Sequence, residues 1–181
     1  ATTEIYTLSL HDALPILIVG DFDSHKDPKL DVETIVLPVE KDDTDTVYAA
    51  KEGMRRGFEE FLLIGAVGAR LDHTLANISI LLMLDKAGKR AQLIDDYSVM
   101  EIVSGKPAFI EDTYPFFSLL NITGTARGVD IANAKYPLCN AEIDCDYQYG
   151  VSNQVLKGAR AMVRVRKGCL LLIKIFRDRT E

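Results

Sequence analysis

The chain has 181 residues, of which 48% are hydrophobic and 27% charged, an ordinary balance for a soluble globular protein. Its apolar runs, such as residues 80–84, are much shorter than the stretch of about 20 residues that crosses a bilayer. The net charge of −6 argues against a nucleic-acid-binding protein, which usually carries a basic face. Three cysteines without a CxxC pair favour free thiols. We therefore expect a cytoplasmic protein that binds neither membranes nor nucleic acids.

The first residues do not resemble a natural N-terminus. Residues 6–16 read YTLSLHDALPI, in which His11 and Asp12 interrupt the apolar stretch, so a signal peptide is a poor match. The codons that spell these residues resemble a common sequencing-library adapter. We expect residues 1–16 to be a non-native segment and leave His11 and Asp12 out of the candidate site.

Residues 17–105 alternate between apolar runs and helical patterns. Four short runs are expected to be buried strands: residues 17–19, 34–37, 61–64 and 91–94. Thr44 is a suitable N-cap for a helix that ends near Gly57. A second helix is predicted by an apolar stripe at helical spacing: Leu71, Leu75, Ile78 and Leu82. Strands that alternate with helices predict an α/β domain with a mostly parallel sheet and flanking helices.

Residues 106–181 show a different pattern, with short apolar runs broken by glycine, proline and asparagine. Arg164 and Arg166 alternate with Val163 and Val165, as expected for a strand with one buried face. The Lys-Gly pair that follows is typical of a hairpin turn. These features predict a small all-β domain.

Acidic side chains follow the first predicted strand and precede the first predicted helix. Asp21 and Asp23, in GDFDS, lie at the carboxyl end of a strand, where open α/β sheets bind ligands. Asp45, in KDDTD, opens the next helix, whose N-terminus favours a carboxylate. Three carboxylates in one crevice repel each other unless a cation neutralises them, and Mg²⁺ suits such a site. We favour a metal site over a set of separate polar caps.

Two further motifs carry polar residues. In GARLDHTLANI, residues 68–78, Arg70 near a helix N-terminus suits a phosphate because its charge and the free main-chain N–H groups attract anions. His73 and Asn77 share its helix face, although a structural role for His73 is at least as good an explanation. GVSN, residues 150–153, is by itself only a turn that begins with glycine.

Taken together and in order, five segments resemble the thiamine pyrophosphokinase family: GDFDS, EKDDTD, GARLDHTLANI, KYPLCN and GVSN. The resemblance covers residues 17–176. It implies an ATP-dependent transfer of a pyrophosphoryl group to the hydroxyethyl oxygen of thiamine, with release of AMP. It also implies a nucleotide-binding α/β domain, a thiamine-binding β-sandwich domain, and a homodimer with active sites between its subunits.

The resemblance also implies a role for each residue that matches a family motif. The Mg²⁺ ligands would be Asp21, Asp23 and Asp45. The residues lining the same crevice would be Lys41, Asp42 and Thr44. The residues facing the nucleotide phosphates would be Arg70, Asp72, His73 and Asn77. The residues meeting thiamine would be Ser152 and Asn153. The acceptor of the hydroxyl proton stays open between Asp42 and Asp45.

The chain departs from the family pattern at three places. Ala69 stands where a second glycine is usual, and Tyr97 and Ser98 stand where an asparagine is common. The family also begins with a strand and an Asp-Gly-Gly loop, and the adapter-like residues occupy the place where that loop should end.

Two other functions are compatible with parts of the sequence. Asp21 and Asp23 after a strand, with Asp95 and Asp96 after a later one, resemble an aspartate-nucleophile phosphatase of the haloacid dehalogenase type. That interpretation leaves KDDTD, GARLDH and GVSN unexplained. The missing Asp-Gly-Gly loop favours a second alternative, a thiamine or nucleotide sensor that binds without turnover.

Overall fold

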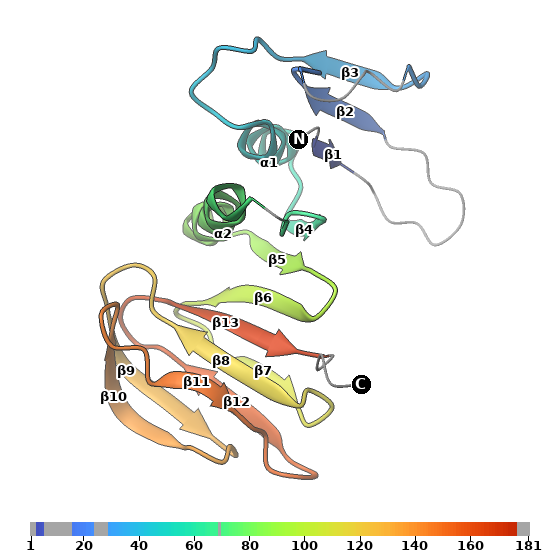
Figure 1. Cartoon of the computed structure of the whole chain (residues 1–181). Helices are drawn as coiled ribbons and strands as arrows, with labels where there is room; N and C mark the ends of the chain where they lie inside the picture. Colours follow the sequence, from blue (N-terminus) through green and yellow to red (C-terminus); the bar gives the residue numbers. More distant parts are fainter. Residues whose placement is uncertain (1–2, 6–15, 24–28, 69, 177–181) are drawn as a thin grey trace. The chain divides into compact units, whose positions relative to one another are not determined.

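The computed structural model describes residues 3–5, 16–23, 29–68 and 70–176 (Figure 1). These residues fold into two units, Ala1–Glu59 and Glu60–Glu181, called unit 1 and unit 2 below. Of the two helices in the described part of the chain, neither has the length and apolar character needed to cross a bilayer.

Unit 1 is a three-stranded sheet with one helix. Its strands lie in the order β1 (Thr3–Ile5), β2 (Leu17–Gly20) and β3 (Glu33–Val36). The β1–β2 pair is antiparallel and the β2–β3 pair is parallel. Helix α1 (Asp45–Arg55) follows, and its Ala49 packs with side chains of β2 in the small core of this unit.

The start of α1 agrees with the sequence. The Oγ1 atom of Thr44 accepts a hydrogen bond from the main-chain N–H of Val47 at 3.3 Å, which confirms Thr44 as the N-cap. Of the predicted non-native segment, residues 1–2 and 6–15 lie outside the described residues, including His11 and Asp12. Its origin stays a prediction.

The larger sheet of unit 2 has six strands, in the order β11-β8-β13-β6-β5-β4. Their bounds are β4 Glu60–Ile64, β5 Arg90–Ile94, β6 Ser98–Val103, β8 Phe116–Leu120, β11 Gly150–Asn153 and β13 Leu170–Ile175. Only the β4–β5 pair is parallel, and the other neighbours are antiparallel. The four strands predicted for the α/β domain pair in parallel, β2 with β3 and β4 with β5, but they lie in two sheets that both also contain antiparallel pairs. The prediction of a mostly parallel sheet is therefore confirmed only in part, because both sheets are mixed.

The reversal between β5 and β6 explains this difference. The Oδ1 atom of Asp95 accepts hydrogen bonds from the main-chain N–H groups of Tyr97 and Ser98, at 2.9 and 2.6 Å. Such a side-chain turn sends the next strand back beside the previous one without a crossover helix. The turn at Asp95 therefore accompanies the antiparallel β5–β6 pair, which the hydrophobic pattern does not reveal.

Helix α2 (Leu71–Lys86) packs on β5 and β6. Its buried side chains are Ile80, Leu81 and Leu84. The predicted apolar stripe is wrong at its start, since Leu71 and Leu75 are 68% and 56% exposed. The second half of this helix is apolar on almost every side, so helical spacing alone does not select the buried face.

A second, four-stranded sheet completes unit 2, in the order β10-β9-β12-β7. Its strands are β7 Ala108–Glu111, β9 Thr125–Ala132, β10 Leu138–Asp144 and β12 Arg160–Arg164. Side chains of both sheets share one core, among them Val103, Ile110, Phe117, Leu119, Val129, Ile143, Val163 and Leu172. The two sheets thus form a sandwich (Figure 1).

The domain limits predicted at residues 105 and 106 stay a prediction. The six-stranded sheet contains β4 to β6 from before this point and β8, β11 and β13 from after it.

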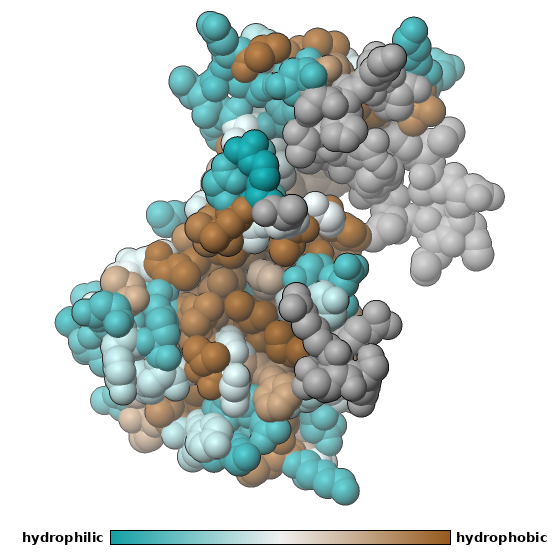
Figure 2. Space-filling view, viewed as in Figure 1, coloured by the Kyte–Doolittle hydropathy of each residue, from teal (hydrophilic) through white to brown (hydrophobic). Residues whose placement is uncertain are grey.

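Hydrophobic side chains also reach the surface of unit 2 (Figure 2), among them Leu62 and Ile64 of β4.

Candidate functional site

Lys41 joins the two acidic motifs of unit 1. Its Nζ atom lies 2.5 Å from Asp21 Oδ2 and 3.0 Å from Asp45 Oδ1. All three side chains are mostly buried. Asp21 directly follows β2, and Asp45 opens α1, so the end of a strand and the start of a helix position the two carboxylates. The sequence placed Lys41 in this crevice but did not predict that its ammonium bridges them.

The ion pairs keep this cluster charged. The hydrogen bond from Lys41 lowers the pKa of Asp21, assisted by the main-chain N–H of Asp23, which donates to Asp21 Oδ1 at 3.3 Å. The same hydrogen bond to Asp21 is the main reason that the pKa of Lys41 is raised. At neutral pH the cluster therefore contains a carboxylate and an ammonium ion in direct contact.

Asp45 shares the cation of Asp21. Its Oδ1 atom is buried, and the ammonium of Lys41 lies 3.0 Å from it as an ion pair. A buried carboxylate is costly unless a cation or a donor satisfies it, and Lys41 supplies the cation here. The cluster therefore has two carboxylates within reach of one cation.

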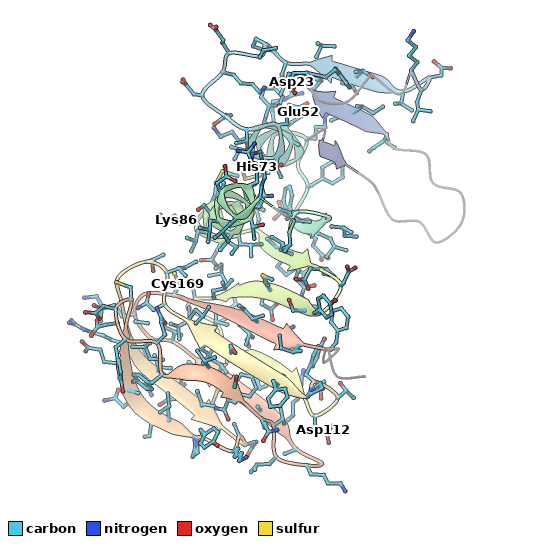
Figure 3. All side chains as sticks on the ribbon, viewed as in Figure 1. Asp23, Glu52, His73, Lys86, Asp112 and Cys169 are labelled. Carbon is cyan, nitrogen blue, oxygen red and sulfur yellow. The ribbon has the colours of Figure 1, made fainter. Side chains whose placement is uncertain are left out.

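Asp23 stands apart from this pair. Its side chain is exposed (Figure 3), whereas those of Asp21 and Asp45 are not. Within the described residues, no three acidic, histidine or cysteine side chains lie close enough together to hold a metal ion. The predicted metal triad of Asp21, Asp23 and Asp45 is thus not assembled in this structure.

The other residues of KDDTD lie at the entrance of α1. Asp42 is exposed, Thr44 caps the helix, and Asp43 forms an ion pair with Lys51 at 2.6 Å. Thr44 therefore has a local structural role whatever else it contacts.

Arg70 is the N-cap residue of α2, and Leu71, Asp72 and His73 begin the helix. Arg70 binds Asp72 through two hydrogen bonds, Nη2 to Oδ2 at 2.5 Å and Nε to Oδ1 at 3.2 Å. This pairing lowers the pKa of Asp72 to about 2. Both side chains are exposed, as is His73 (Figure 3). The pair presents a guanidinium group at the N-terminus of a helix, where anions are favoured.

Asn77 has a structural contact. Its Nδ2 atom donates to the main-chain oxygen of Ala66 at 2.8 Å and so holds the loop between β4 and α2. Thr74 holds the same loop, because its hydroxyl accepts a hydrogen bond from Gly68 N at 3.2 Å. Ala69 lies outside the described residues.

The GVSN motif forms β11, at the edge of the six-stranded sheet. Gly150 lies opposite Leu119, and a Cβ atom on it would lie 2.8 Å from the main-chain oxygen of Leu119. The pairing shifts between Gly150 and Asn153, which marks a β-bulge. Within the bulge, Ser152 has a φ of 57° and donates its main-chain N–H to Ser118 Oγ at 3.0 Å.

The bulge separates the two predicted thiamine contacts. Ser152 is exposed, whereas Asn153 is 3% exposed. The carboxamide of Asn153 is bonded to main-chain groups of Tyr136 and Gln154. The sequence did not single out Tyr136, although it lies in the quoted KYPLCN segment.

One of the acids of the phosphatase interpretation, Asp95, has a structural role. Asp95 is the turn residue between β5 and β6, and its Oδ1 also accepts a hydrogen bond from Ser98 Oγ at 2.9 Å. Asp96 is exposed. Asp95 thus has a structural explanation that needs no phosphatase chemistry.

Two family models match the chain. Residues 4–93 match the model described as "Thiamin pyrophosphokinase, catalytic domain". Residues 108–170 match the model described as "Thiamin pyrophosphokinase, vitamin B1 binding domain". Together they cover most of the chain, in the order of the sequence motifs.

Individual proteins agree with the models. Thiamine pyrophosphokinase of Bacillus subtilis is 26% identical over an alignment of 178 positions, and the alignment covers 93% of this chain and 83% of the relative. The crystal structure of the Bacillus subtilis enzyme has a TM-score of 0.79 at 24% identity, over 92% of this chain and 81% of that one. Thiamin pyrophosphokinase from Geobacillus thermodenitrificans has a TM-score of 0.77 at 25% identity, over 92% and 79%.

More distant structures share the fold. Thiamin pyrophosphokinase from Candida albicans has a TM-score of 0.73 at 17% identity, over 91% of this chain and 74% of that one. These matches support neither the phosphatase nor the sensor interpretation. The chain matches the catalytic model and then the vitamin B1 binding model, one after the other. It therefore belongs to the thiamin pyrophosphokinase family.

Proposed function

We propose that this chain is a thiamine diphosphokinase, which converts ATP and thiamine into AMP and thiamine diphosphate. The observation that carries the proposal is the presence of both family domains, catalytic and vitamin B1 binding, in one chain. In the reaction, the hydroxyethyl oxygen of thiamine forms a bond to the β-phosphorus of ATP. The bond from that phosphorus to the α-bridging oxygen breaks, and AMP leaves with this oxygen.

Mg²⁺ is the cofactor proposed for the acidic cluster. The residues suit such an ion, because the carboxylates of Asp21 and Asp45 already share one cation and carboxylate oxygens are ligands of Mg²⁺. Asp23 would join them from the same loop. When bound, Mg²⁺ would supply positive charge to the polyphosphate.

Lys41 would have two roles in this cluster. Before substrate binds, its ammonium holds the carboxylates of Asp21 and Asp45 near each other and offsets their repulsion. With substrate present, the same ammonium would bind a phosphate oxygen, since positioning and charge stabilisation dominate phosphoryl transfer. The hydroxyl proton would pass to Asp42 or to Asp45.

Arg70 is proposed to bind the nucleotide phosphates. Asp72 accepts hydrogen bonds from its Nε and Nη2 atoms, which orients the guanidinium plane and leaves Nη1 outside these two bonds. His73, on the same helical turn, would add a second donor. Asn77 would support this turn through the β4–α2 loop rather than bind substrate.

The proposed enzyme acts as a cytoplasmic homodimer. The free cysteines Cys139, Cys145 and Cys169 suit a reducing compartment. The family resemblance supports active sites that combine residues of two subunits. Mixing an Asp21→Asn chain with a Ser152→Ala chain tests this arrangement, because only shared sites allow activity to return in the mixture.

The decisive experiment is product analysis after incubation with MgATP and thiamine. AMP and thiamine diphosphate should appear in equal amounts, and AMP should not form without thiamine. Asp21→Asn should reduce the rate by about two or more orders of magnitude. Asp43→Asn is a matched control, because Asp43 pairs with Lys51 outside the cluster. Release of inorganic phosphate without thiamine would contradict the proposal.

A further inference from the structure

Two arginines on the outer face of the four-stranded sheet share one aspartate. Arg164 ends β12 and Arg166 follows it, and both are exposed, whereas Val163 and Val165 between them belong to the core. The Nη2 atom of Arg164 lies 3.1 Å from Asp130 Oδ2, and that of Arg166 lies 2.7 Å from the same oxygen. Because both guanidinium groups contact one oxygen atom, they lie side by side on the sheet. They are called the arginine pair below.

Asp130 carries one negative charge beneath the arginine pair. Its Oδ1 atom accepts the main-chain N–H of Asn140 at 2.8 Å. This hydrogen bond, followed by the one from Arg164, lowers the pKa of Asp130. At neutral pH the group therefore contains one carboxylate and two guanidinium ions.

Arg166 is held along its whole length. Its Nη1 atom donates to the main-chain oxygen of Gly128 and to Asn140 Oδ1, both at 3.2 Å. Gly128 has a φ of 64°, and a Cβ atom on it would lie 2.9 Å from three carbons of the Arg166 side chain. Asn140 has a φ of 51° and lies where the pairing of β10 with β9 shifts. An exposed ion pair adds little to stability, so these contacts favour a side chain arranged for binding.

The other arginines of this sheet are neutralised one to one. Arg127 of β9 pairs with Glu142 of β10 at 2.9 Å, and Arg160 of β12 pairs with Glu111 of β7 at 2.6 Å. The arginine pair differs from them, because two cations share the single carboxylate of Asp130. An excess of one positive charge is therefore fixed at this point of the sheet.

We propose that the arginine pair binds a phosphate or diphosphate group. Within the described residues, Nε and Nη1 of Arg164 and Nε of Arg166 have no partner, so three donor atoms remain for a ligand. Guanidinium groups with fixed planes suit phosphate oxygens, and such an anion supplies the negative charge that the pair lacks. The inference does not rest on the proposed function, since the GVSN motif lies in the other sheet and the acidic cluster in unit 1.

The test is calorimetric titration with inorganic pyrophosphate, without Mg²⁺, in an Arg70→Gln background that removes the arginine proposed to bind the nucleotide. We expect a Kd of about 1 mM, raised about tenfold by Arg164→Gln or by Arg166→Gln. Arg127→Gln and Arg160→Gln are matched controls, because each removes the same charge from the same sheet, and they should change the Kd less than about twofold. Equal weakening by all four substitutions, or none by Arg166→Gln, would overturn the proposal.

A further variant separates geometry from charge. Arg166→Lys keeps the positive charge but loses the planar donor group, so it should bind pyrophosphate nearly as weakly as Arg166→Gln. Binding as tight as that of the unsubstituted arginine would refute a site built on the guanidinium plane. Because these side chains are exposed, all the variants should keep their melting temperature within a few degrees.

Two other ligands identify the source of the anion. ADP that binds with the Kd of pyrophosphate, and depends on the arginine pair, would assign the site to the diphosphate group alone. Tighter binding of ADP with the same dependence would assign it to a nucleotide. A hexaglutamate peptide that binds through the arginine pair while pyrophosphate does not would overturn the proposal in favour of an acidic protein partner.

Discussion

The ammonium of Lys41 and the carboxylate of Asp21 lie 2.5 Å apart, although 20 positions separate them in the chain. The same ammonium lies 3.0 Å from Asp45 Oδ1, so Lys41 contacts both of the carboxylates that are proposed to bind Mg²⁺. A metal ion bound there, as proposed, would compete with Lys41 for these oxygens. The ammonium of Lys41 would then be available to a phosphate.

Replacement of Lys41 by methionine should separate metal binding from catalysis. Without the competing ammonium, Mn²⁺ used as a probe should bind about tenfold more tightly, as followed by electron paramagnetic resonance. The kcat should fall by about two orders of magnitude because a phosphate ligand is lost. Lys51→Met, which removes the partner of Asp43, is the control. Weaker Mn²⁺ binding in Lys41→Met would show that the two cations do not compete.

The acid stability of unit 1 should depend on Glu52 of α1, labelled in Figure 3. Hydrogen bonds from Arg55, and then from Arg56, lower its pKa from 4.5 to about 2. Because the pKa in the folded state is the lower one, this stabilisation is present above the unfolded pKa and is lost as the pH falls.

The measurement is the free energy of unfolding of wild type and Glu52→Gln as a function of pH. The difference should be constant above about pH 5 and shrink steadily toward about pH 3. Glu40→Gln, at an exposed position before α1, should show no such trend. A difference that persists unchanged to low pH would contradict the assigned ion pairs.

Asp95 should stabilise the fold through its turn and should take no part in the reaction. Asp95→Ala removes three hydrogen bonds to Tyr97 and Ser98 and should cost about 1–3 kcal/mol in the free energy of unfolding. Asp95→Asn keeps the accepting oxygen and should cost less. Thiamine-dependent turnover at low temperature should be similar in both. Loss of turnover in a folded Asp95→Asn protein would return this residue to the list of candidate catalytic groups.

Gly150 should tolerate no side chain. A Cβ atom there would lie 2.8 Å from the main-chain oxygen of Leu119, so Gly150→Ala must push β11 away from β8. We expect a loss of about 1–3 kcal/mol in stability, together with a raised thiamine KM. Gly68→Ala, where nothing lies within 4 Å of the added atom, is the control for stability. Equal melting temperatures for the two variants would contradict the close approach.

Much of the local structure could be predicted from the sequence. The strand that begins at Leu17 and the helix that follows Thr44 were expected, because a short apolar run and a capping residue act locally. The direction of β6 was not expected, since the turn before it is made by the hydrogen bonds of Asp95. The buried face of α2 was also missed, because its apolar residues surround the helix.

The site was predictable as a set of motifs but not as a set of contacts. Asp21 and Asp45 were expected to lie together, and they do, through Lys41. The burial of Asn153 rather than Ser152 could not be predicted, because one extra residue in β11 changes which side chain faces inward. Sequence spacing does not reveal such a bulge.

The position of β6 affects how the catalytic and vitamin B1 binding halves of the chain could be exchanged with those of relatives. Residues 98–103 lie between the two matched family models, yet β6 pairs with β5 on one side and with β13 on the other. Six residues of β13 are in register with it, from Leu170 opposite Val103 to Ile175 opposite Ser98. A vitamin B1 binding half that begins at residue 108 and continues through β13 would expose the edge of β13 that pairs with β6. Chimeras that swap this half between relatives should therefore carry β6 with it.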